Sequence, residues 1–146
     1  MKPNFLKALG AGIAGTLAMT AVMWMAPRMG MPPMDIGHML GSVMGGNDAL
    51  GWTAHFMIGI LLAVVYAAAF AGRLPGAPVL RGVAYSLGPW LMAQLVVMPM
   101  MGMGLFSGSM MMAAGSLVGH VVYGAVLGGV YGRVAGVTTP AHAVPA

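Results

Sequence analysis

The chain has 146 residues, of which 60% are hydrophobic, and only six basic and two acidic side chains carry charge. Its mean hydropathy of +0.90 is far above that of soluble domains. A soluble domain of this size leaves too much of its surface wet to bury so many apolar side chains, so lipid is predicted to surround the protein. The absence of cysteine excludes disulfides and thiolate chemistry. The scattered basic residues lack the cluster that nucleic acid binding requires.

Four transmembrane helices are predicted from the spacing of the charged residues. A helix needs about 20 residues to cross the hydrocarbon core of a bilayer. Three long stretches contain no Asp, Glu, Lys or Arg, namely residues 8–27, 49–72 and 82–132. The third is too long for one span, and the turn-forming sequence MGMGLFSGS at 101–109 divides it into two. The expected fold is all-α, a single domain over residues 1–137 with helices at about 5–26, 50–72, 80–100 and 109–134.

The orientation is predicted from the bias of Lys and Arg toward cytoplasmic connections. Five basic residues fall on one side of the predicted topology: Lys2, Lys7, Arg73, Arg81 and Arg133. Only Arg28 falls on the other side, so both termini are expected on the cytoplasmic face of a bacterial inner membrane. A cleaved signal peptide is the rival interpretation of the first helix. Its apolar run is long for such a peptide, and Trp24 and Pro27 do not suit a cleavage site.

The first outer loop is expected to contain a short interfacial helix at about residues 33–45. Pro32 and Pro33 precede it, and Asp35 stands where a carboxylate meets the positive end of a helix. Asp35 and His38 share a face, so they are candidates for binding a cation together, although a capping Asp and a solvated His form the simpler interpretation. The tail at residues 138–146 (TTPAHAVPA) is short and polar and contains proline, and it is predicted to be disordered.

The second and fourth predicted helices repeat a pattern at an offset of 65 residues. His55, Gly59, Leu62, Tyr66 and Ala67 correspond to His120, Gly124, Leu127, Tyr131 and Gly132. We interpret residues 5–72 and 80–136 as two tandem two-helix repeats, with a pseudo-symmetry axis along the membrane normal. Chance agreement in a sequence rich in Gly and Ala is the alternative.

Small residues recur at every fourth position of both helices and predict contact surfaces, because such residues let helix backbones approach closely in lipid. His55 and His120 begin these stripes, so both are expected in the bundle interior at similar depth. In the third helix, Pro89 and Pro99 predict a kink, and Gln94 between them is expected to face inward.

Ionisable side chains inside a bilayer are costly and often functional. The structural interpretation of the two histidines is that each donates to a carbonyl one turn back or to a hydroxyl such as that of Thr16, Thr20 or Ser116. A functional interpretation is ligation of haem b by the pair, with room for the macrocycle at Gly59 and Gly124.

A second functional interpretation is a Cu(I) or other metal site, because thioethers and imidazoles are soft ligands and almost all 18 methionines fall in the outer half of the predicted topology. Methionine also serves as a flexible core residue, which is the structural alternative. The candidate metal ligands are His55, His120, His38, Asp35, Met31 and Met103.

Several segments resemble a family of small bacterial four-helix membrane proteins of unknown function. They are MGMPPMDIGHMLGSVMGG at 29–46, GWTAHFMIGILL at 51–62, PMMGMGLF at 99–106 and GHVVYGAVLGGVYG at 119–132. The resemblance implies a four-helix membrane fold and no activity. The family pattern includes the residues that are Asp35, His55 and His120 here.

No nucleophile, base and orienting acid can be assembled within one span, so no enzymatic activity is predicted. The leading expectation is a non-catalytic accessory or structural subunit of a larger membrane complex, such as a respiratory or electron-transfer complex. Haem b binding, copper binding and a small transporter are the alternatives. The expected partners are the lipid bilayer and either other membrane subunits or a second copy of the chain.

Overall fold

The computed structural model describes residues 3–133, which contain helices and no strand. Four helices are long and apolar enough to span a membrane, which confirms the predicted multi-pass all-α fold. The first is α1 (Phe5–Met25), continued by the 3-10 turn η1 (Ala26–Met29). The second is α3 (Asp48–Val65), continued by the π-helix η2 (Tyr66–Phe70). The third comprises α4 (Pro78–Met92), the π-helix η3 (Ala93–Val97) and α5 (Met98–Met100), and the fourth is α6 (Met110–Arg133).

The helix starts follow from local capping. The side chain of Asn4 accepts a hydrogen bond from the backbone N–H of Lys7 at 3.0 Å, and Asn47 accepts from the first-turn N–H groups of α3. Pro78 occupies the first turn of α4, where its missing N–H costs nothing. These caps place the observed helices within a few residues of the predicted ones.

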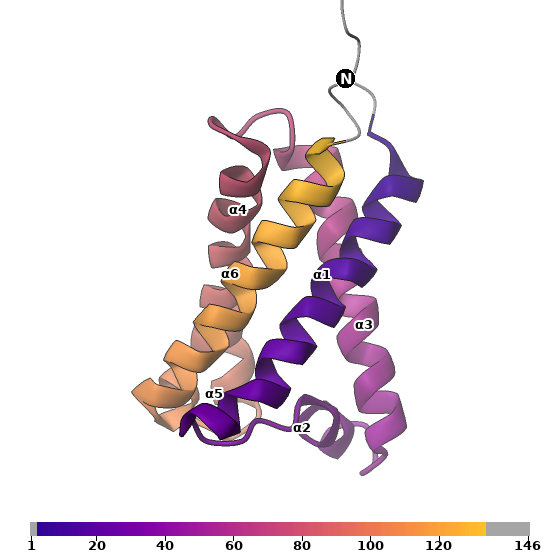
Figure 1. The fold of residues 1–146 in the computed structure, drawn as a ribbon. Coiled ribbons are helices and arrows are strands. Elements are labelled where there is room, and N and C mark those ends of the chain that lie inside the picture. The colour runs from indigo at the N-terminus through magenta and orange to yellow at the C-terminus, as the bar shows by residue number, and fades with distance from the viewer. Residues whose placement is uncertain (1–2, 134–146) are drawn as a thin grey trace, which may run out of the picture.

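The helix expected at 33–45 forms over the shorter range of α2 (Ile36–Ser42). It lies across the end of α3, with Gly37 against Gly51 in a contact that leaves no room for a side chain. Figure 1 shows α2 at the end of the bundle opposite to the start of α1. Its placement at a membrane interface stays a prediction, and the tail predicted at 138–146 lies outside the described residues.

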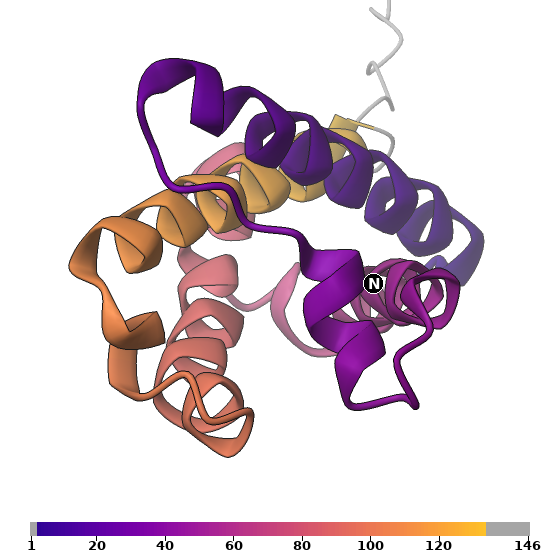
Figure 2. The same ribbon diagram turned by 90° about the horizontal axis from the view of Figure 1, so that it is seen from below.

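The four long helices form an open arc rather than a closed ring. Helix α1 packs against both α3 and α6, and α6 packs against α4. Viewed along the bundle in Figure 2, the order is therefore α3, α1, α6, α4. Helices α3 and α4 approach each other near η2, where the hydroxyl of Tyr85 donates to the carbonyl oxygen of Leu62 at 2.8 Å. The Tyr85 ring packs at a tilt against the Tyr66 ring, with the centroids 5.2 Å apart.

The predicted stripes of small residues are confirmed as helix contacts. A side chain at Gly124 or Gly128 of α6 would overlap with the backbone of α4, and one at Gly59 of α3 would overlap with Thr16 of α1. Through these residues the second span packs on the first, and the fourth span packs on the third. The duplication itself stays a prediction.

Candidate functional site

A cavity of about 920 Å³ lies between α3 and α4, with α1 and α6 behind it. Most of its wall is apolar and rich in methionine; the α3 side includes Ile58 and Leu62, the α4 side includes Met92 and Val97, and α1 contributes Met19 and Met23. Ile58 and Met92 are 48% and 64% exposed, respectively. The cavity is therefore open on the side where α3 and α4 separate, which faces lipid in a membrane.

His55 lies on the cavity wall and is buried, with only 8% of its surface exposed. Its Nε2 is 3.2 Å from the Thr20 hydroxyl, and that hydroxyl donates its one proton to the carbonyl oxygen of Thr16 at 2.8 Å. The Thr20 oxygen therefore accepts from an Nε2–H of His55. In the neutral ring this leaves a lone pair on Nδ1.

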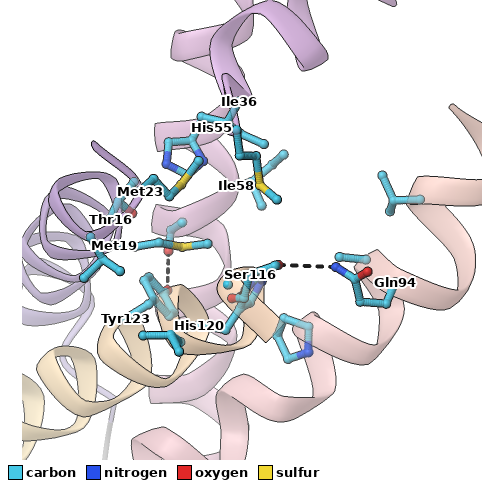
Figure 3. Close-up of a pocket in the computed structure, with 18 of the residues that line it drawn as sticks. Thr16, Met19, Met23, Ile36, His55, Ile58, Gln94, Ser116, His120 and Tyr123 are labelled. Atoms are coloured by element: carbon cyan, nitrogen blue, oxygen red, sulfur yellow. Dashed lines mark hydrogen bonds between the residues drawn. The ribbon is translucent and has the colours of Figure 1, made fainter. Parts of the chain in front are cut away.

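His120 lies on the wall of the same cavity, on α6. Its Nδ1 is 2.9 Å from the carbonyl oxygen of Ser116, one turn back. Because a carbonyl only accepts, Nδ1 carries the proton and Nε2 carries the lone pair. Figure 3 shows His55 and His120 among the residues that line the cavity, with Met19 and Met23 beside them. Both histidines thus make the hydrogen bonds expected of the structural interpretation, and each keeps one ring nitrogen as an acceptor.

Gln94 forms a buried polar link at the α4 side of the cavity. It lies in η3, is 1% exposed, donates to the Ser116 hydroxyl at 3.3 Å and accepts from the Ser107 hydroxyl at 2.8 Å. The prediction that it faces inward is confirmed. The partner Ser107 was missed by the sequence analysis. Ser107 and Phe106 both have positive φ, of 59° and 52°, an arrangement that residues with side chains adopt only when the surrounding contacts hold them.

Tyr123 is a further cavity residue that the sequence analysis missed. It is buried, and its hydroxyl donates to the carbonyl oxygen of Gly59 at 2.6 Å. Its ring also contacts Gly15 of α1 closely. Its place on the face of α6 between the two small-residue positions Gly119 and Gly124 was the available signal.

Of the candidate metal ligands in the segment between α1 and α3, Asp35 and His38 do not line the cavity. Asp35 caps α2 by accepting from the backbone N–H of His38 at 2.9 Å, and the His38 ring pairs with Asp48 at 3.1 Å on the exposed surface. Met31 does line the cavity, whereas Met103 lies in the turn after α5 and does not. Over residues 3–133, no group of three or more His, Asp or Glu side chains is arranged to hold a metal ion.

The space expected for a porphyrin at the two glycines is occupied. Thr16 fills the position beside Gly59, and Gly82 and Ser86 of α4 fill the position beside Gly124. The described residues of the cavity wall include no Lys or Arg, the side chains that would pair with haem propionates. Ligation of haem b by His55 and His120 stays an untested prediction that the packing does not favour.

The comparisons with known proteins identify a family and no function. Neither the curated proteins nor the solved structures contain a match to the chain. The model of the family of unknown function DUF6789 matches residues 3–142, nearly the whole chain, including the segments whose resemblance is described above. The protein is therefore a multi-pass membrane protein that belongs to this family of unknown function.

Proposed function

We propose that the protein is a non-catalytic protein of the bacterial inner membrane that binds an uncharged, lipid-like molecule in the cavity between α3 and α4. The cavity itself carries this proposal. Its volume of about 920 Å³ falls within the range of roughly 300–1,000 Å³ that is typical of small-molecule sites. A mostly apolar wall with a few convergent polar groups is also typical of such sites.

The chemistry of the wall supports an uncharged ligand. None of its described residues is an Asp, Glu, Lys or Arg, so a charged ligand would be desolvated without a counter-ion. The opening between α3 and α4 supports entry from the hydrocarbon core rather than from water. A carrier or sensor of a lipid-soluble molecule fits the expected role as an accessory subunit, because the protein would present its ligand to a larger membrane complex or to a second copy.

The non-catalytic character is supported by how the polar groups are bonded. The hydroxyls of Thr16, Tyr85 and Tyr123 donate to backbone carbonyls, and Gln94 is paired with two serines. These bonds fix the helices together rather than activate a nucleophile. Small-transporter activity has less support, because the described residues of the cavity wall include no carboxylate for proton coupling.

Copper binding is the second candidate. Met19, Met23 and Met31 line the cavity together with both histidines, and each histidine donates its other ring N–H to an oxygen, as metal-bound histidines do. An uncharged ligand is favoured over Cu(I) because no described anionic side chain of the cavity wall would balance the charge of the ion.

A pair of glycine variants tests the lipid-binding proposal. Gly88 lines the cavity and Gly10 of α1 does not, and a side chain at either position would meet no neighbouring atom within 4 Å. Gly88→Trp is therefore expected to fill the cavity without disturbing helix packing, and Gly10→Trp is the matched control. Each protein is purified in mild detergent, and extracted lipids are quantified by mass spectrometry.

The expected result is that a specific lipid co-purifies in near-stoichiometric amount with the wild type and with Gly10→Trp, and is lost from Gly88→Trp at an unchanged melting temperature. The proposal is wrong if no lipid is enriched over the bulk membrane composition in the wild type, or if Gly88→Trp retains the enriched lipid.

A further inference from the structure

We infer that the ligand of this cavity has a hydroxylated head group, and that the site prefers a lipid-soluble quinol or long-chain alcohol to the corresponding quinone. This inference rests on the proposed function and specifies its ligand class. It is drawn from the direction of the hydrogen bonds around His55 and His120, two imidazoles on the wall of one cavity.

The first step concerns His55. Its Nε2–H is held by the Thr20 oxygen, whose own proton is donated to the Thr16 carbonyl. The opposite ring nitrogen, Nδ1, has no hydrogen-bond partner within the described part of the chain, although the residue is 8% exposed. The rings of Trp52 and Phe56 pack edge-on against the His55 ring, with centroids 5.9 and 5.7 Å away from its centroid. Neither ring makes a hydrogen bond to His55. Nδ1 therefore offers a lone pair to a ligand.

The second step concerns His120, whose ring is held in the opposite tautomer. Its Nδ1–H donates to the Ser116 carbonyl at 2.9 Å, which leaves the lone pair on Nε2. This nitrogen also has no partner within residues 3–133. In the neutral form of both rings the ring protons are committed to protein oxygens, so the two imidazoles present acceptors to the cavity.

Three hydroxyls of the cavity wall add no donor to the two imidazoles. Thr16 donates its hydroxyl proton to the carbonyl of Gly12, Tyr123 donates to Gly59, and Ser107 donates to Gln94. Their protons are therefore engaged within the protein. A ligand that donates complements the two imidazoles, whereas a ligand that only accepts would place its oxygens against lone pairs.

A quinone and its quinol form a matched pair for this distinction, because they share a ring and an apolar tail and differ in whether the two oxygens carry protons. An unmatched acceptor in a buried site costs the desolvation of that group, so the quinol is expected to bind about tenfold more tightly or better. A saturated or isoprenoid alcohol with the same tail has one donating hydroxyl and tests whether the ring is needed.

The experiment uses the full chain in lipid nanodiscs under anaerobic conditions. A benzoquinol with a short isoprenoid tail, the matching benzoquinone and the alcohol of that tail are titrated separately by isothermal calorimetry. The expected result is saturable binding of the quinol or the alcohol at least about tenfold tighter than that of the quinone. Tighter binding of the quinol than of the alcohol identifies a quinol site. Tighter binding of the alcohol identifies a site for a lipid alcohol. Equal or tighter binding of the quinone overturns the inference, while the lipid-binding function stands.

Variants of the two histidines supply the second readout. His55→Leu and His120→Leu are each expected to lower the affinity for the hydroxylated ligand about tenfold and to reduce the preference for the quinol over the quinone. His38→Leu is the control, because His38 is exposed and outside the cavity wall. A parallel loss of affinity for both oxidation states would mean that the histidines only shape the bundle, and this would overturn the inference. If none of the three ligands binds to the wild type, the proposed function and the inference both fall.

Discussion

The hydroxyl of Tyr123 on α6 donates a 2.6 Å hydrogen bond to the carbonyl oxygen of Gly59 on α3. These two helices are separated by α1 in the arc, and the ring of Tyr123 passes close to Gly15 of α1 on its way. The bond closes the bundle behind the cavity, while the opposite side between α3 and α4 stays open. The cavity therefore lies between this closed side and the side where α3 and α4 separate.

Removing the Tyr123 hydroxyl is expected to destabilise the protein. Tyr123→Phe deletes a buried hydrogen bond and keeps the ring, so the free energy of unfolding should fall by about 1 kcal/mol. The measurement is unfolding in mixed micelles by SDS titration, followed by circular dichroism. Tyr131→Phe is the control, because the Tyr131 oxygen takes part in a weaker 3.3 Å contact with the backbone N–H of Asn4. An unchanged stability of Tyr123→Phe would contradict a role in closing the bundle.

The contact between α4 and α6 is expected to tolerate no added methyl group. A Cβ at Gly82 would overlap with backbone atoms of Gly124 and Gly128, which cannot move aside as a flexible side chain does. Gly82→Ala should therefore lower the free energy of unfolding by about 1–3 kcal/mol, the usual cost of overpacking. Gly88→Ala lies on the same helix with open space around it and should be neutral or stabilising. Equal stabilities of the two variants in the same SDS titration would show that α4 and α6 do not pack as described.

The link between Ser107 and Gln94 is expected to hold the turn at residues 101–109 against the bundle. Ser107→Ala leaves the Gln94 Oε1 without its 2.8 Å donor in a buried position, at a cost of about 1–3 kcal/mol. The double variant Ser107→Ala with Gln94→Leu should recover part of this loss, because the unpaired acceptor is then removed as well. Hydrogen exchange of residues 101–109 is a second measurement and should increase in the single variant. Additive losses in the double variant would argue against a coupled pair.

The predicted orientation is testable because the chain contains no cysteine, so any introduced thiol is a unique label. Ala49→Cys lies in the exposed first turn of α3, and Ala77→Cys lies in the exposed turn before α4. In whole bacterial cells, a membrane-impermeant maleimide is expected to label Ala49→Cys alone. Labelling of Ala77→Cys in intact cells, with Ala49→Cys protected, would reverse the orientation that the basic residues indicate.

Copper and haem can be tested on the same purified protein. A lipid-binding cavity predicts a colourless preparation with less than one tenth equivalent of copper or iron, and no uptake of Cu(I) that depends on His55. The measurements are a visible spectrum, elemental analysis and a Cu(I) titration against a chromogenic chelator, with His38→Leu as the control. A Soret band that is lost in His55→Ala and His120→Ala would establish haem, and His55-dependent Cu(I) binding would replace the lipid proposal with a copper site.

The sequence alone determined the number, length and approximate ends of the spans. This was possible because the hydrocarbon thickness sets helix length, and because charged residues, prolines and capping side chains such as Asn47 act locally. The small-residue stripes likewise predicted which faces meet, since close approach of two backbones requires glycine or alanine on that face. The inward position of Gln94 and the hydrogen bonds of the two histidines to Thr20 and Ser116 follow from the cost of an unpaired polar group in an apolar interior.

The tertiary structure alone decided that the four helices form an arc with a cavity instead of a closed bundle. Whether α3 and α4 meet along their length depends on crossing angles and on residues from all four helices, which no pattern within one helix encodes. Only the tertiary structure shows that Met31 lies on the cavity wall and that Met103 does not. Ser107 reaches Gln94 only because a turn with positive φ angles folds it back into the bundle. Local patterns record which residues avoid water, whereas the placement of a cavity depends on where packing between distant segments is left incomplete.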